Sequence, residues 1–66
     1  RGKINARAEM LYRRGVKHFL NEELELAIKD WKETLKLNPN HPKAAQDIEN
    51  AERLLQKWRG LEKPEQ

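Results

Sequence analysis

The side chains that could perform covalent chemistry are few and far apart along the chain. Cysteine and serine are absent, and Thr34 is the one threonine. Nucleophilic catalysis needs a hydroxyl or thiol beside a base, which leaves Thr34 and Tyr12, and both fall on helix faces predicted to be core. His18 and His41 lack the i, i+4 spacing of a helical metal site, so we interpret both as solvated. We therefore expect no enzyme activity, no cofactor and no metal site.

Three carboxylates cluster at Glu22, Glu23 and Glu25 and could be taken for acid–base groups. They lie at the start of a predicted helix, where the helix dipole stabilises negative charge. This local effect explains the cluster better than catalysis does, so the chemistry of the side chains favours a binding or structural protein.

The composition predicts one small domain with a thin core. The 66 residues are 38% charged and 36% hydrophobic, and a chain this short buries a smaller share of its surface than a large domain does. No apolar run approaches the roughly 20 residues of a membrane span, so membrane insertion is not expected. The chain begins at Arg1 rather than Met, which suggests a piece of a longer protein. Its compartment, cytoplasm or bacterial envelope, is left open.

A helical period of 3.6 residues predicts three amphipathic helices, at about residues 3–20, 22–37 and 42–59. Asn21 suits the N-cap of the second helix. Gly60 offers a stop for the third, which leaves residues 61–66 as a frayed tail. The positions predicted to face inward are Ile4, Ala8, Leu11, Tyr12, Gly15, Val16 and Phe19 in the first helix, Leu24, Ala27, Ile28, Trp31 and Leu35 in the second, and Ala44, Ile48, Ala51, Leu55 and Trp58 in the third.

Two prolines separate the second helix from the third. Pro39 cannot continue a helix and pushes Asn38 out of helical geometry. Pro42 suits the first position of a new helix, which Asn40 or His41 would cap. Because short joints make sequence neighbours pack antiparallel, we predict an all-α fold of three antiparallel helices in a single domain, residues 1–60.

The segment AEMLYRRGVKHFLNEELELAIKDWKETLKLNPN, residues 8–40, resembles a tetratricopeptide repeat (TPR). That repeat follows the pattern W-x2-L-G-x2-Y, then A-x3-F, then P, over 34 residues. Twelve residues separate Gly15 from Ala27, and twelve separate Ala27 from Pro39, as in the family. The resemblance covers one full repeat, about residues 8–41, and implies a helical hairpin. The residues at the motif positions are Leu11, Gly15, Ala27, Trp31 and Pro39.

Besides Leu11, which stands in place of the Trp, the chain departs from the family pattern at four positions. Arg14 stands where the repeat has Leu, and His18 where it has Tyr, so the first helix loses apolar area. One period later, Glu49 replaces the glycine and Ala45 the aromatic residue. The third helix therefore resembles the capping helix that closes a TPR array.

The resemblance implies a non-catalytic protein–protein interaction module with a concave groove lined by the first helix of each repeat. Some TPR proteins hold a peptide's terminal carboxylates with a Lys and Asn clamp. Tyr12 and Val16 stand in those places here, so we expect no clamp and instead an apolar helix or an extended peptide of some acidic character. The interpretation that the third helix only solvates a cap stays open. The predicted groove residues are Glu9, Tyr12, Val16 and Phe19 from the first helix and Lys43, Gln46, Asn50 and Arg53 from the third.

Other surfaces and functions also stay open. The net charge is +5 over residues 1–20, −2 over 21–39 and zero over 40–66. The basic residues of the first helix could neutralise phosphates, but its aromatic residues, Tyr12 and Phe19, lie on the other arc and do not interleave with them, so a solvated face is favoured over a nucleic-acid-binding bundle. A stripe on the second helix could also contact a partner. The basic face comprises Lys3, Arg7, Arg13, Arg14 and Lys17, and the stripe comprises Leu26, Asp30, Glu33 and Leu37.

A further alternative is a structural role, as an oligomerisation unit or as the end piece of a longer TPR scaffold. Repeat proteins need about three stacked units for independent stability, and this chain has one repeat and a cap. We therefore expect an additional contact, for which a homodimer or a dimer with swapped helices are candidates.

Overall fold

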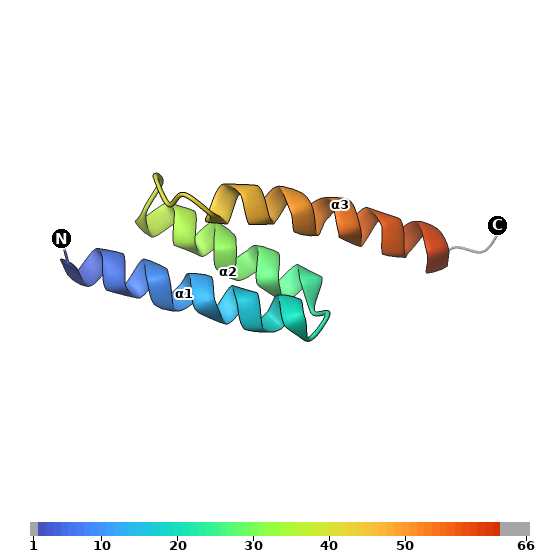
Figure 1. The fold of residues 1–66 in the computed structure, drawn as a ribbon, viewed down its shortest axis with the longest axis horizontal. Coiled ribbons are helices and arrows are strands. Elements are labelled where there is room, and N and C mark those ends of the chain that lie inside the picture. Colours follow the sequence, from blue (N-terminus) through green and yellow to red (C-terminus); the bar gives the residue numbers. More distant parts are fainter. Residues whose placement is uncertain (1, 63–66) are drawn as a thin grey trace.

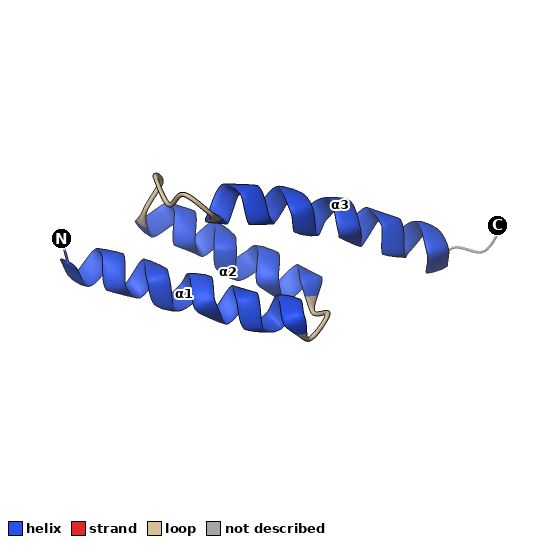
Figure 2. Ribbon diagram, viewed as in Figure 1, coloured by secondary structure: helices blue, strands red, loops and turns tan. Residues whose placement is uncertain are grey.

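The computed structural model describes residues 2–62 of the chain and the side chains of residues 6–60. It contains three helices, α1 (Gly2–Leu20), α2 (Leu24–Leu37) and α3 (Ala44–Glu62). In Figure 1, α1 and α3 flank α2, which runs antiparallel to both. Figure 2 shows that helices account for nearly all of the described chain, with two short loops joining them. The predicted all-α fold of three antiparallel helices is confirmed.

The joint between α1 and α2 differs from the prediction. The N-cap of α2 is Glu23, which makes no side-chain capping bond, so the assignment of Asn21 as N-cap was wrong. Instead, the backbone N–H of Glu23 donates to His18 O at 2.8 Å, and that of Glu22 to Phe19 O at 3.0 Å. These two bonds form a Schellman motif, which ends a helix with one residue in the left-handed region. Glu22 is that residue, at φ 65°, a conformation in which glycine is usual.

The joint between α2 and α3 has the expected turn. The N–H of Asn38 donates to Thr34 O at 2.8 Å and closes the last turn of α2. The Nδ1 atom of His41 then accepts the N–H groups of Lys43 and Ala44, both at 3.2 Å. His41 therefore caps the start of α3, whereas Pro42 lies just before the helix.

The end of α3 also differs from the prediction. The helix runs through Gly60 as far as Glu62, so the proposed stop at Gly60 was wrong, and 61–62 are helical rather than frayed. No atom outside the helix backbone lies within 4 Å of an added Cβ at Gly60. Residues 63–66 of the predicted tail lie outside the described residues, as do the side chains of Lys3 and Ile4. The single domain over residues 1–60 stays a prediction.

The core forms between α2 and α3 and is covered by α1. Half-buried side chains of α1 (Tyr12, Val16 and Phe19) pack against it. Three of the core residues are alanines, whose small side chains let helix backbones lie close together. The buried cluster comprises Ala27, Ile28 and Trp31 from α2 and Ala44, Ile48 and Ala51 from α3.

The contact between α1 and α2 is tight at Gly15. A Cβ added there would lie 2.4 Å from Nε1 and 2.6 Å from Cδ1 of Trp31. The Trp31 indole N–H donates to the carbonyl of Tyr12 at 3.0 Å, and its ring centroid is 5.8 Å from that of Phe19. The glycine thus makes room for the indole, which is wedged against α1.

Candidate functional site

The eight predicted groove residues do not all come together. Glu9, Tyr12 and Lys43 line one hollow of about 250 Å³, along with residues of the joint before α3. Val16 and Phe19 are half-buried against the core. The remaining three, Gln46, Asn50 and Arg53, are exposed along α3 and do not line that hollow.

A hydrogen bond connects α1 to α3 at this hollow. The Tyr12 O–H donates to Oδ2 of Asp47 at 2.5 Å. Burial, followed by this bond and the negative charges of Asp47 and Glu9, raises the pKa of Tyr12 to about 12. The phenol therefore stays protonated, and able to donate, in more alkaline solution than an ordinary tyrosine does.

His41 is the centre of the same contact and is not solvated as predicted. It is 9% exposed, and its ring centroid lies 4.7 Å from that of Tyr12. Because Nδ1 accepts two backbone N–H groups, the neutral ring must carry its proton on Nε2. That nitrogen lies 3.2 Å from Oε1 of Glu9, so it donates to the carboxylate. His41 thus joins α1 to the start of α3.

Sequence reasoning missed His41 and Asp47 as part of the site. Tyr12 and Asp47 are 35 residues apart, and Glu9 and His41 are 32 apart. No local spacing relates residues at such separations. The only available signal was the capping position of His41, which places its ring at the turn but does not reveal the stacking on Tyr12.

A second polar network lies on the opposite side of α1. Asp30 is 5% exposed, and Arg14 binds it through two bonds, Nε to Oδ2 at 2.9 Å and Nη2 to Oδ1 at 3.0 Å. The hydrogen bond and the charge of Asp30 raise the pKa of Arg14. His18 lies between this carboxylate and Glu23, whose Oε1 is 2.7 Å from its Nδ1. His18 is half-buried and paired, so its interpretation as a solvated residue was also wrong.

The basic face of α1 is partly neutralised by these contacts. Arg14 is bound to Asp30, and Arg13 lies 3.7 Å from Glu9 one turn earlier. Of the stripe predicted on α2, Asp30 is buried, Leu37 is half-buried and Leu26 is 46% exposed. The stripe is thus not a continuous exposed surface.

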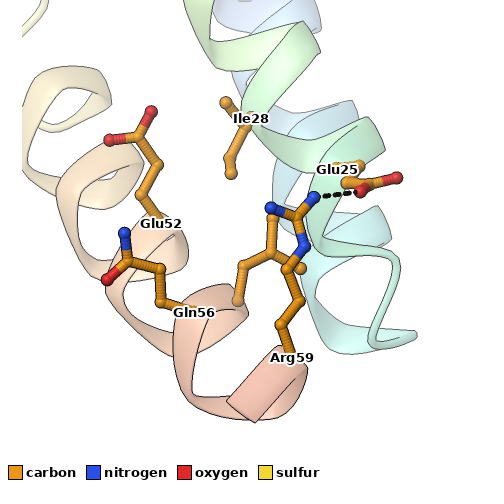
Figure 3. A pocket seen from close by; sticks show the side chains of 6 residues that line it. Glu25, Ile28, Glu52, Gln56 and Arg59 are labelled. Carbon is orange, nitrogen blue, oxygen red and sulfur yellow. Dashed lines mark hydrogen bonds and ion pairs between the residues drawn. The ribbon is translucent and has the colours of Figure 1, made fainter. Parts of the chain in front are cut away.

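The hollow between α2 and α3, about 460 Å³, is spanned by charged side chains (Figure 3). Arg59 of α3 reaches across to Glu25 of α2, with Nη2 to Oε2 at 2.8 Å. A second pair, Lys32 with Glu52, joins the same two helices at 4.0 Å. Ile28 forms part of the floor of this hollow. Polar side chains thus cover apolar surface here, as expected for a cap.

The described residues contain neither a candidate metal site nor a membrane-spanning helix. No cluster of three or more His, Cys, Asp or Glu side chains that could hold a metal ion is found in that part of the chain. Within residues 2–62, no helix has both the length and the apolar character needed to cross a membrane.

The comparisons with known proteins agree with the helical hairpin. The family model described as tetratricopeptide repeat matches residues 8–41. No match was found among curated proteins or among solved structures.

Proposed function

The chain belongs to the tetratricopeptide repeat family, and on this premise we propose that it binds a peptide or helix in a groove that α1 and α3 form over α2. Repeats of this family are non-catalytic and mediate protein–protein interaction. The proposed partner-binding residues are the eight predicted ones, with Leu20 added.

The observation that carries the proposal is an accessible apolar edge of α1 opposite a polar edge of α3. Val16 and Leu20 are one helical turn apart and therefore share a face of α1. Leu20 is 74% exposed, a large apolar surface left without cover. Lys43 and Asn50 are exposed near and on α3. This combination suits a segment with apolar side chains and some acidic character.

One observation favours a second candidate function, that of a structural end piece. The Glu25–Arg59 and Lys32–Glu52 pairs cover the α2–α3 hollow on the side away from α1. A terminal unit of a repeat array needs such a polar outer face for solubility. The two functions are compatible, since a cap can also contribute one wall of a groove.

The test uses a library of short displayed peptides, from which binders are selected and their dissociation constants measured by fluorescence anisotropy. We expect selected peptides to combine apolar and acidic residues. Reversing the charges of the α3 edge with Lys43→Glu and Arg53→Glu should weaken binding at least tenfold at low salt. The matched control is Lys29→Glu, because Lys29 is an exposed lysine of α2 outside the proposed groove.

A second variant tests the apolar edge. Leu20→Ala should weaken binding without unfolding the protein, since the side chain is largely exposed. If no peptide is selected, or if Lys29→Glu weakens binding as much as the groove variants do, the groove proposal is wrong.

A further inference from the structure

A hollow of about 390 Å³ lies between α1 and α2, on the side of α1 opposite the groove. Its apolar part consists of Met10, Leu11 and Leu37, and Arg7, Arg14 and Glu33 surround it. Met10 is 70% exposed, whereas Leu11 and Leu37 are half-buried beneath it. We call these six residues the outer face.

The outer face is less covered by its own charges than the α2–α3 hollow is. Among the described residues, the pairs that link α1 to α2 on this side both end on the buried Asp30, one from Arg14 and one from His18. Glu33 instead pairs with Lys36 of its own helix at 3.5 Å, and an exposed pair within a helix contributes little. The apolar seam along Met10 therefore stays accessible.

The charges of the outer face are divided between its two edges. The α1 edge carries Arg7 and Arg14, and the α2 edge carries Glu33. The neighbouring Asp30 is buried and already bound by Arg14, so it adds no free charge. A wholly acidic segment would meet Glu33, and a wholly basic one would meet the two arginines. A surface that is basic on one edge and acidic on the other is complementary to a copy of itself turned by a two-fold rotation.

We propose that the outer face binds a second copy of this chain. A two-fold axis along the seam lays α1 of one copy over α2 of the other, which is the geometry of a self-complementary interface. Arg7 of each copy then faces Glu33 of the other, and the two Met10 side chains pack in the shared seam. The result is a four-helix arrangement in which each groove between α1 and α3 remains open.

The size of the outer face sets the strength of the dimer. The 14 residues of α2 span about 21 Å, and two helices packed about 10 Å apart give a face roughly 20 Å wide. Each copy thus contributes about 400 Å², well below the ~800 Å² per partner of a standard stable interface. The dimer is therefore weak and forms only at high protein concentration.

The experiment is sedimentation equilibrium of the full chain, from micromolar to millimolar concentration at low salt. We expect the mass to rise towards twice the monomer value as concentration increases. Met10→Glu should keep the protein monomeric over the same range. The matched control is Leu20→Glu, which places the same charge at an equally exposed apolar residue about 15 Å further along α1, outside the outer face, and should leave dimerisation unchanged.

Charge exchange tests the geometry of the pairing. Glu33→Arg alone should weaken dimerisation at least tenfold, and the combination of Glu33→Arg with Arg7→Glu should restore it, because the two charges face each other across the axis. A monomer at every concentration would overturn the proposal and leave the outer face to a foreign partner. An equal effect of Met10→Glu and Leu20→Glu, or no rescue by the charge exchange, would overturn it as well.

The dimer proposal does not rest on the proposed function, and each of the two proposals can be refuted without the other. Met10→Glu should leave peptide affinity unchanged, since Met10 lies outside the groove, whereas Leu20→Ala should reduce peptide affinity and leave the dimer intact. Loss of peptide binding in Met10→Glu would show that the two surfaces are not independent.

Discussion

Replacing Gly15 by alanine should destabilise the fold, although the same change usually stabilises a helix. The added Cβ would lie 2.4 Å from Nε1 and 2.6 Å from Cδ1 of Trp31, far inside van der Waals contact. The indole cannot move away without loss, because it is 2% exposed and its N–H donates to the Tyr12 carbonyl. The helices must therefore separate, or the indole must leave its place.

The magnitude follows from three opposing effects. Overpacking a buried site costs about 1–3 kcal/mol, and loss of the indole hydrogen bond costs about 1 kcal/mol. Alanine in place of glycine inside a helix returns about 1 kcal/mol. We therefore expect Gly15→Ala to lower the free energy of unfolding by about 1–3 kcal/mol, a large share of the stability of a domain this small.

The matched control is Gly60→Ala in α3. Nothing lies within 4 Å of an added Cβ at Gly60, so only the helix preference acts and the free energy of unfolding should rise by up to about 1 kcal/mol. Urea unfolding followed by far-ultraviolet circular dichroism measures both changes. If Gly15→Ala stabilises the protein as Gly60→Ala does, the contact with Trp31 is not what requires a glycine there.

Three further changes test other contacts. Glu22→Gly should raise the free energy of unfolding by up to about 1 kcal/mol, since glycine tolerates the left-handed φ of 65° that other residues disfavour; Glu22→Ala, as the control, should show no gain. The raised pKa of Tyr12 predicts stability that is present below pH 10 and lost as the pH rises towards 12, a decline that Tyr12→Phe should abolish. Since Tyr12 is the one tyrosine, its absorbance should titrate near pH 12 in the folded protein and near pH 10 in urea. Arg14→Leu alone should destabilise the protein more than Arg14→Leu combined with Asp30→Leu, because the single change removes the arginine that binds a buried carboxylate through two hydrogen bonds; equal losses in urea unfolding would contradict this reasoning.

The helices and their order could be predicted because local rules determine them. The apolar period places Ala27 and Trp31 on the core face of α2, and Pro39 marks the region where that helix ends. The residues at which the helices begin and end were less predictable. Asn21 looked like a cap, but a non-glycine residue, Glu22, takes the left-handed position that glycine usually marks. Gly60 looked like a stop, but an exposed glycine can also continue a helix.

The polar contacts of the site were not predictable from the sequence. The sequence identifies Arg14 and His18 as departures from the repeat, but it places their partner, Asp30, in an exposed stripe. Its burial depends on how α2 packs against α1, which spacing along one helix does not reveal. The same holds for His41 and Asp47, whose contacts with α1 depend on the angle of α3. Patterning within each helix thus predicted which residues form the core. The packing of the helices against one another determines which polar side chains are buried and paired.

The two ends of the His41 ring make this position unusually intolerant of substitution. Asparagine places an acceptor where Nδ1 lies and could cap α3, but it is too short to reach Glu9. Glutamine places a donor where Nε2 lies and could reach Glu9, but its amide oxygen lies at the same far end of the side chain, away from the N–H groups of Lys43 and Ala44. No other side chain accepts at one end and donates at the other across a flat ring that also stacks on Tyr12. Every replacement therefore gives up at least one of the three contacts that hold the joint together, and the identity of the lost contact tells which half of the joint will loosen.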